Sequence, residues 1–436
     1  MMRKASFHAG MISGQNSANL VLCLEPEAAC MACEDQRNSP LDDGASSAAV
    51  AASLQILKNG DTFMVLDCGG GTVDITAHHV VGTNPLRLAE ARKPSGGPWG
   101  STYVDQEFEQ FLQAMIGEDS WKLFKSSSAW AQTMEEWEAT KCAFDPSEKQ
   151  DDPSSACSMR VAALSEALRE LPVPAGGTEL SLSDLVRKYN TDFGGQLESR
   201  RSILKIPFVK MQHFFANIIR KIVAHVQHLI QETSVNYIYL VGGFAESKML
   251  QMQVKSLSTS EVQVIVPMYP QFMVVTGAVL FGLQKGSTIE SRVARLTYGY
   301  LVLEHWKEKD EIHKKRGFQI IDGVKYVNGQ VFKSLVEQGS TIKVLHTETS
   351  QVCSPADKRN SDIVFQLYSS QDDDVKFFNP AEAIHTRIGE VRGPCADGEF
   401  STLSISFGST EIRATAFNET TKVSSQADIN FNFDSV

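Results

Sequence analysis

A run of three glycines between two apolar segments constrains this chain more than any other feature. Residues 61–66 form an apolar run typical of a buried strand, and residues 75–81 alternate as a second strand does. Gly69, Gly70 and Gly71 lie between them, so the connecting backbone is expected to adopt unusual dihedral angles or to approach another group closely. Glycine-rich turns expose backbone N–H groups, and several such groups directed at one point bind phosphate.

Carboxylates flank this turn on both sides. Asp67 precedes the glycines, and Asp74 follows Thr72 by two positions. Carboxylate oxygens suit a Mg²⁺ ion that keeps most of its water ligands. A tight hairpin that binds nothing explains a bare glycine run equally well, but the flanking Asp, Thr and Asp favour a bound phosphate. The turn is therefore predicted to bind phosphate, with Asp67 and Asp74 near the metal ion.

The segment Asp67–Asp74 resembles the second phosphate loop of the actin-like ATPase superfamily, and within it that of the seventy-kilodalton heat-shock proteins. Two further segments match in the correct order, Glu25-Pro26-Glu27-Ala28-Ala29 upstream and Leu240–Ser247 downstream. In these forms they resemble the divergent heat shock 70 kDa protein 12 branch. The resemblance covers about residues 1 to 285 well and the remainder loosely.

The resemblance implies an α/β fold with two parts. An actin-like, ribonuclease H-like nucleotide-binding domain is expected at residues 1–286, with its second lobe at 60–286 and an inserted subdomain at about 96–204. From residue 287 onward, short strand patterns separated by Gly and Asp clusters predict a β-rich domain at 287–436, in the position of the family's substrate-binding domain. The family's first phosphate loop and catalytic lysine are not found before Glu25, so an amino-terminally truncated domain is expected.

The resemblance also implies roles for residues outside the glycine turn. Glu25, at the end of an expected strand at 20–24, would help to hold the metal's water shell and the attacking water, so Glu25 and Asp67 are the expected catalytic residues. A helix-terminus carboxylate is the alternative for Glu25. Glu138 and Lys141 lie on one face of a helix expected at 119–144, where the family contacts ribose and base, and a surface ion pair is the alternative.

The turn formed by Gly242 and Gly243 follows a predicted strand at 237–241 and precedes a predicted helix. This arrangement favours an anion or nucleotide at the helix amino terminus. Phe244 would cover a purine face or, alternatively, belong to the core. The expected ATP/ADP contacts are therefore Gly69, Gly70, Gly71, Thr72, Glu138, Lys141, Gly242, Gly243 and Phe244.

The charge and composition of the chain limit the classes of partner and the cell compartment that are expected. The net charge of −11 argues against a broad nucleic-acid surface, and the longest strongly apolar stretch, 272–283, is too short to span a bilayer. The eight cysteines show no paired spacing except Cys30-x-x-Cys33, which is expected to lie on a helix rather than to form a metal or redox site. This pattern indicates a reduced, intracellular chain, so a cytoplasmic or additionally nuclear location is expected.

Three functions are consistent with these features of the sequence. The first is a chaperone-like protein that binds ATP/ADP and Mg²⁺, with unfolded peptide, client or co-chaperone proteins as partners. Because phosphoryl transfer needs clamps from both lobes, ATP hydrolysis is expected to be weak or absent. The second is a non-enzymatic interaction scaffold with a degenerate nucleotide domain. A sugar kinase of the same superfamily is less favoured, because no catalytic aspartate is placed in a sugar pocket.

Overall fold

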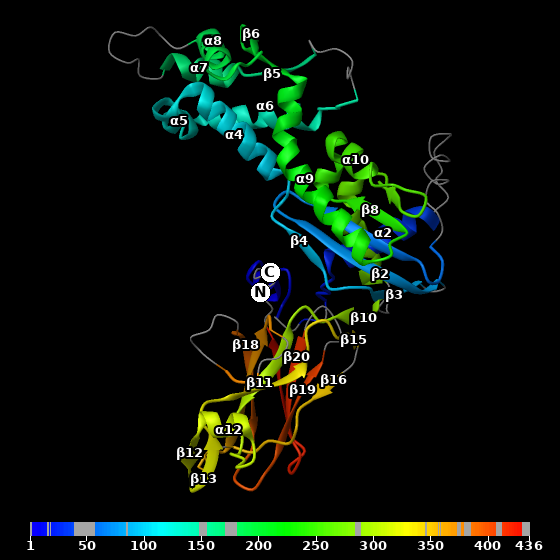
Figure 1. Cartoon of the computed structure of the whole chain (residues 1–436), viewed down its shortest axis with the longest axis vertical. Helices are drawn as coiled ribbons and strands as arrows, with labels where there is room; N and C mark the ends of the chain where they lie inside the picture. Colours follow the sequence, from blue (N-terminus) through cyan, green and yellow to red (C-terminus); the bar gives the residue numbers. More distant parts are fainter. Residues whose placement is uncertain are drawn as a thin grey trace.

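The computed structural model describes residues 2–14, 17, 19–38, 57–83, 86–147, 155–170, 181–283, 289–344, 347–355, 357, 359–372, 376–378, 385–406 and 412–429. Figure 1 shows a helical region at the top, a large sheet flanked by helices in the middle and a β-rich region at the bottom.

The large sheet carries the glycine turn. β1 (Thr62–Cys68) and β2 (Val73–Thr83) form an antiparallel hairpin around the turn, and β8 (Tyr237–Val241) pairs in parallel with β1 on its other side. The strand order is β15-β10-β3-β2-β1-β8-β9, with β4 also beside β2. The other members are β3 (Leu86–Glu90), β4 (Ser95–Gly97), β9 (Gln263–Ile265), β10 (Ile289–Val293) and β15 (Thr341–Lys343). This mixed sheet with parallel pairs is compatible with an actin-like domain.

Helices cover both faces of this sheet, so β1 is buried along its whole length. Met64 and Leu66 pack into one apolar core, which they share with α9 (Phe208–Glu232) and α10 (Lys248–Lys255). Phe63 and Val65 point the other way, into a core that they share with α2 and α11. The alternation of side chains along the strand thus divides the residues between two cores.

The helices α2 (Glu25–Asn38) and α11 (Met273–Leu283) make the closest helix–helix contact in this part of the molecule. A Cβ atom on Gly277 would lie 1.6 Å from the carbonyl oxygen of Ala28, so only glycine permits the approach. Cys30 and Cys33 lie buried on α2, as expected for two cysteines on a helix, and form no disulfide.

The helical region is built around aromatic rings. Phe108 stacks on Trp137 with 3.9 Å between ring centroids, and Phe214 of α9 packs edge-on against both rings. The elements are α4 (Thr102–Ile116), α5 (Glu118–Lys125), α6 (Ser128–Cys142), α7 (Ala162–Glu170), α8 (Leu182–Phe193), β5 (Ala156–Arg160), β6 (Glu198–Arg200) and β7 (Ile203–Pro207).

The single helix expected at 119–144 is two helices, α5 and α6. The side chains of Ser126 and Ser127 donate hydrogen bonds to the carbonyl oxygens of Leu123 and Phe124, at 2.9 and 2.7 Å. Local bonds of this kind satisfy the backbone without continuing the helix, which explains the break between α5 and α6.

The β-rich region contains two four-stranded sheets that share one core. The first has the order β14-β11-β17-β18, and the second β16-β19-β20-β21. Their bounds are β11 (Thr297–Val302), β14 (Val331–Val336), β16 (Thr347–Thr349), β17 (Asp362–Ser370), β18 (His385–Pro394), β19 (Ser401–Ser406), β20 (Ile412–Asn418) and β21 (Ser424–Ile429). The β-rich character predicted from residue 287 onward is confirmed.

Two details of this region differ from expectation. Residues 319–326, where the sequence pattern predicts one strand, form a hairpin of β12 (Phe318–Ile321) and β13 (Val324–Val327), because Asp322 and Gly323 take positive φ angles of 47° and 79° and turn the chain. In addition, β10 and β15 belong to the large sheet although both follow residue 286, so the two parts of the chain are joined by strand pairing.

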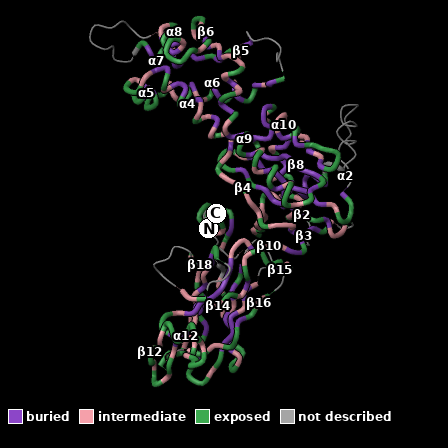
Figure 2. Tube along the Cα trace, viewed as in Figure 1, coloured by how far each residue is buried: buried purple, intermediate pink, exposed green. Residues whose placement is uncertain are grey.

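The amino-terminal segment also differs from expectation. After α1 (Met2–His8), residues 20–24 form no strand, and Val21 is 58% exposed. No described strand lies beside them to complete a ladder. Figure 2 shows that buried residues concentrate along the large sheet and within the β-rich sheets. None of the described helices combines the length and apolar character needed to cross a bilayer.

Candidate functional site

The glycine turn is a short hairpin connection with ordinary dihedral angles. Asp67 pairs with Asp74 across the hairpin, and the N–H of Gly69 donates to the carbonyl oxygen of Thr72 at 2.9 Å. None of the three glycines has a positive φ angle, so the expected unusual dihedral angles are not found there. A Cβ atom on Gly70 or Gly71 would meet nothing within 4 Å. The turn is therefore open on the side to which these Cβ atoms would point.

The carbonyl oxygens of the three glycines are held by residues 100–102. Thr102 donates twice to the carbonyl of Gly70, from its backbone nitrogen and from its hydroxyl, each at 2.9 Å. Within the described part of the chain, the N–H groups of Gly70, Gly71 and Thr72 have no acceptor. The turn thus directs its carbonyls into the protein and leaves three amide donors for an anion.

Gly100 is essential to this arrangement, and sequence reasoning did not identify it. A Cβ atom at this position would lie 2.2 Å from the carbonyl oxygen of Gly70. The signal was present in the sequence, where Gly96, Gly97 and Gly100 precede Ser101 and Thr102 within a few residues. In this structure Ser101 and Thr102 support the turn by bonding to its backbone, at 3.1 Å from Ser101 to Gly69.

Three carboxylates lie near enough to interact electrostatically beside the turn, those of Glu25, Asp67 and Asp74. Asp67 is 7% exposed at the end of β1, and Glu25 begins α2 close by. Burial, followed by the charges of Glu25 and Asp74, raises the pKa of Asp67 to about 6. Thr72 donates to Asp74 at 3.0 Å, whereas no described group donates to the Asp67 carboxylate. The structure therefore brings together the carboxylates that the sequence singled out.

These carboxylates fit a hydrated cation better than a directly coordinated one. Among the described residues, no three His, Cys, Asp or Glu side chains lie close enough to coordinate one metal ion. Mg²⁺ commonly keeps several waters and binds through one or two carboxylates plus phosphate oxygens. Asp67 and Asp74, with Glu25 nearby, provide hard oxygen ligands and the negative charge that such an ion requires.

Gly242 lies against Asp67 at the end of the neighbouring strand. Its φ angle is 93°, and a Cβ atom there would come within 2.4 Å of Asp67 Oδ1 and of the Cys68 carbonyl oxygen. The expected helix does not start directly after this turn. A 3₁₀ turn, η1 (Gly243–Glu246), comes first, and α10 begins at Lys248 with Ser247 as its cap.

Gly243 and Phe244 have different surroundings. Gly243 is exposed, and a Cβ atom on it would meet nothing within 4 Å. Phe244 is only 5% exposed and packs in the apolar core beside α9 and α10. Phe244 is therefore a core residue, which was the alternative to a purine contact. Its side chain does not lie free beside the turn to cover a purine.

The nucleoside end of the expected site contains a partly buried ion pair. Lys141 is 7% exposed and bonds to Asp105 at 2.8 Å and to Glu138 at 2.6 Å. Burial acts to lower the pKa of Lys141, but its bonds to the two carboxylates outweigh burial and raise it. Asp105 also accepts from the indole nitrogen of Trp137 at 2.8 Å. Lys141 is thus held inside the helical region, and Glu138, which is 56% exposed, is the accessible member.

The end of α6 faces the segment that follows Gly242. The thiol of Cys142 donates to Glu138 at 3.3 Å and interacts electrostatically with Glu246 of η1. Burial and then the Glu138 carboxylate raise the pKa of Cys142 to about 11, so this thiol stays protonated near neutral pH. Glu138 and the Gly242 turn therefore belong to the same part of the molecule. Asp105, in the first turn of α4, was not singled out from the sequence.

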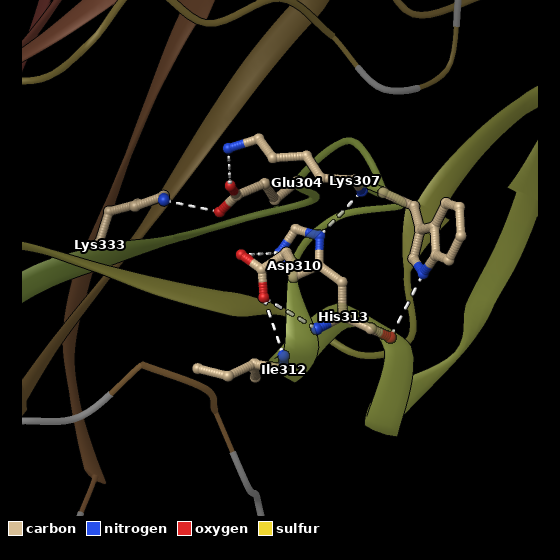
Figure 3. A network of polar contacts seen from close by, with 7 residues as sticks. Glu304, Lys307, Asp310, Ile312, His313 and Lys333 are labelled. Atoms are coloured by element: carbon tan, nitrogen blue, oxygen red, sulfur yellow. Dashed lines mark hydrogen bonds and ion pairs between the residues drawn. The ribbon is translucent and has the colours of Figure 1, made fainter.

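A second polar cluster lies in the β-rich region and has a structural role (Figure 3). Asp310 caps α12 (Glu311–Arg316) by accepting from the backbone nitrogens of Ile312 and His313, at 2.9 and 3.1 Å. The ring of His313 is buried and accepts from the backbone nitrogen of Lys307 at 2.9 Å. Its polar atoms serve the local fold, so this cluster is not a candidate site.

Comparison with known proteins finds relatives that align over almost the whole chain. The chain is 30% identical over 477 residues to heat shock 70 kDa protein 12A of Homo sapiens. The alignment covers 99% of this chain and 68% of that protein. The Mus musculus protein of the same name is 30% identical over 478 residues with the same coverage. Heat shock 70 kDa protein 12B of Homo sapiens is 27% identical over 498 residues. No family model matches the chain.

Proposed function

Since the chain belongs to the heat shock 70 kDa protein 12 family, we propose that it binds ADP and ATP with Mg²⁺ at the glycine turn. The observation that carries this proposal is the pairing of two features at one place. The amides of Gly70, Gly71 and Thr72 lack acceptors in the described chain, and Asp67, near the end of the strand that leads into this turn, pairs with Asp74 across the hairpin. Amide donors fit phosphate oxygens, and the carboxylate fits the accompanying cation.

Asp67 and Asp74 would hold the hydrated Mg²⁺ ion, with Glu25 directed at its water shell. The ion would neutralise negative charge on the phosphates. The mutual repulsion of these carboxylates, which contributes to the raised pKa of Asp67, supports a cation at this position. Glu138, at the end of α6, would contact the nucleoside, and the exposed Gly243 would let the base approach the backbone.

The strand order β3-β2-β1-β8-β9 supports the finer proposal that this sheet is the second lobe of an actin-like, ribonuclease H-like domain. We place that lobe at residues 60–286, with the helical region at about 96–204 inserted in it. Only one phosphate clamp is contained in these elements, so weak or absent ATP hydrolysis is the activity that we expect. We propose the β-rich region as the part that binds client or co-chaperone proteins.

Isothermal titration calorimetry with ADP, ATP and adenosine, each with Mg²⁺ and with EDTA, tests the proposal. ADP and ATP should bind within about tenfold of one another, a difference of about 1.4 kcal/mol, because the γ-phosphate gains few contacts. Both should bind more tightly with Mg²⁺ than with EDTA. Equal binding in the two buffers would argue against the metal site, and rapid Mg²⁺-dependent turnover would contradict the expected weak hydrolysis.

An exposed apolar stripe on α11 favours the second candidate, a non-enzymatic interaction scaffold. Val275, Val279 and Leu283 lie one turn apart and are 58%, 59% and 73% exposed. Apolar residues at this spacing form a continuous surface on one side of a helix. Thermal melting separates the two candidates, because a nucleotide-binding protein is stabilised by millimolar nucleotide and a scaffold with a degenerate site is not.

A further inference from the structure

A buried ion pair connects the first turn of α2 with strand β10. Arg292 donates from Nε and Nη2 to the two carboxylate oxygens of Glu27, at 2.9 and 3.0 Å. The side chain of Glu27 is 3% exposed and that of Arg292 17%. This two-pronged geometry is the strongest form of an arginine–carboxylate contact. It joins residues 265 positions apart in the chain.

The surroundings make this pair depend on both partners. Burial raises the pKa of Glu27, while the Arg292 charge acts to lower it, so the carboxylate relies on the guanidinium to remain ionised. The backbone nitrogen of Val293, the next residue of β10, donates to the buried Glu90 at 2.7 Å. Burial, followed by the Arg292 charge, lowers the pKa of the neighbouring His78 to about 4, so that ring is neutral and does not compete for Glu27.

The same helical turn reaches the candidate nucleotide site. Glu25 and Glu27 are two positions apart, so their side chains leave α2 in different directions. Glu25 begins α2, which packs in a shared core against β1, the strand that carries Asp67, whereas Glu27 bonds to Arg292. A helical turn moves as a unit, since its residues share backbone hydrogen bonds. A displacement of Glu27 therefore displaces Glu25.

We propose that Arg292 is a positioning residue for the nucleotide site: by clamping Glu27 it holds the first turn of α2 so that Glu25 faces Asp67. Arg292 lies on β10, which pairs with β3 of the large sheet. The inference rests on the proposed nucleotide binding.

A second ion pair on the same strand provides a matched control. Glu290 of β10 bonds to Arg87 of β3 at 2.5 Å, and the two side chains are 43% and 51% exposed. This ion pair joins β10 to β3, and no described bond connects it to α2. Exposed pairs of this kind contribute little to stability. Glu290→Gln therefore removes one carboxylate from β10 without affecting the clamp.

The test compares the full chain with its Arg292→Gln and Glu290→Gln variants by two measurements. Hydrogen–deuterium exchange without nucleotide reports the docking of β10, and calorimetry with ADP reports the site in Mg²⁺ and in EDTA. Arg292→Gln should speed exchange in β10 and weaken Mg²⁺-dependent ADP binding by about five- to tenfold. Binding in EDTA should change little, because Glu25 acts through the metal's water shell. Glu290→Gln should match the parent in both measurements.

The possible results distinguish a failure of the inference from a failure of the proposed function. If Arg292→Gln exchanges faster but binds Mg²⁺-ADP as the parent does, the pair anchors β10 only and the positioning role is wrong. Unchanged exchange in β10 would also overturn it. A parent chain that binds no nucleotide would refute the proposed function itself. Should Arg292→Gln fail to fold, Arg292→Lys gives the same comparison, because it keeps the charge and loses the two-pronged contact.

Discussion

Gly242 and Asp67 lie at the ends of two parallel strands and approach more closely than any side chain on residue 242 would allow. A Cβ atom on Gly242 would come within 2.4 Å of Asp67 Oδ1, and the backbone there has a φ angle of 93°. Gly242→Ala should therefore destabilise the chain by more than about 1 kcal/mol, since both steric overlap and backbone strain oppose the new side chain. Chemical denaturation measures this loss.

Gly243→Ala provides the matched comparison. The added methyl group meets nothing within 4 Å, and the φ angle of this residue is not positive, so stability should change by less than about 1 kcal/mol. ADP affinity should nevertheless fall if the base approaches the backbone at this point. An unchanged affinity would show that the nucleoside lies elsewhere.

Substitutions at Gly70 and Gly100 should affect different properties, ligand binding for Gly70 and stability for Gly100. Space is open around Gly70, so Gly70→Val should fold normally and lose ADP binding because its side chain blocks phosphate. Gly100→Ala would place a carbon 2.2 Å from the Gly70 carbonyl oxygen and should lower the melting temperature instead. If Gly70→Val binds ADP as tightly as the parent, the phosphate-loop assignment is wrong.

Asp67→Asn should stabilise the chain near neutral pH in the absence of nucleotide. The folded-state pKa of about 6 lies above the ordinary value of 3.8, so ionisation of Asp67 opposes folding. This cost is small below the unfolded pKa, grows between about pH 4 and pH 6, and levels off above pH 6 at about 2 to 3 kcal/mol. Denaturation curves should show the largest gain for Asp67→Asn near pH 7.5 and almost none near pH 3. The exposed Asp74→Asn should gain much less.

The same carboxylate should make nucleotide binding depend on pH. Protonation removes the charge that holds the cation, so Mg²⁺-dependent ADP affinity should fall as the pH is lowered through about 6. Binding in EDTA should vary less over this range, and Asp67→Asn should lose the Mg²⁺ dependence at every pH. A Mg²⁺ effect that persists in Asp67→Asn would assign the metal to other ligands.

Glu138 and Asp105 share one lysine but should behave differently. Glu138→Ala should cost less than about 1 kcal/mol of stability, because the side chain is 56% exposed, and should weaken ADP and ATP equally. Asp105→Ala leaves the buried Lys141 and Trp137 without their shared acceptor, so a loss of about 3 kcal/mol is expected. Thr72→Ala, at the phosphate end, should weaken ADP more than adenosine. Calorimetry and denaturation of the three variants distinguish these roles.

Local sequence patterns sufficed for most of the elements around the site. The apolar runs and the glycine turn predicted the β1–β2 hairpin, and the apolar run at 237–241 predicted β8. Asp67 and Asp74 were singled out because they flank the glycine turn, whereas Glu25 was singled out through the family resemblance. These features depend on residues close together in the chain, where periodicity and turn preferences act directly.

Tertiary structure alone decided which of these groups are free to act. The sequence suggests Lys141 as an accessible ligand, but in the structure Lys141 is paired with Asp105. It also suggests Phe244 as a cover for a purine, but the side chain of Phe244 is buried in the core. The same holds for Arg292, whose partner Glu27 lies 265 positions away, and for Gly100, which is needed only because the glycine turn packs on it. Burial and pairing are set by contacts between distant segments, and a linear pattern does not contain the distances between them.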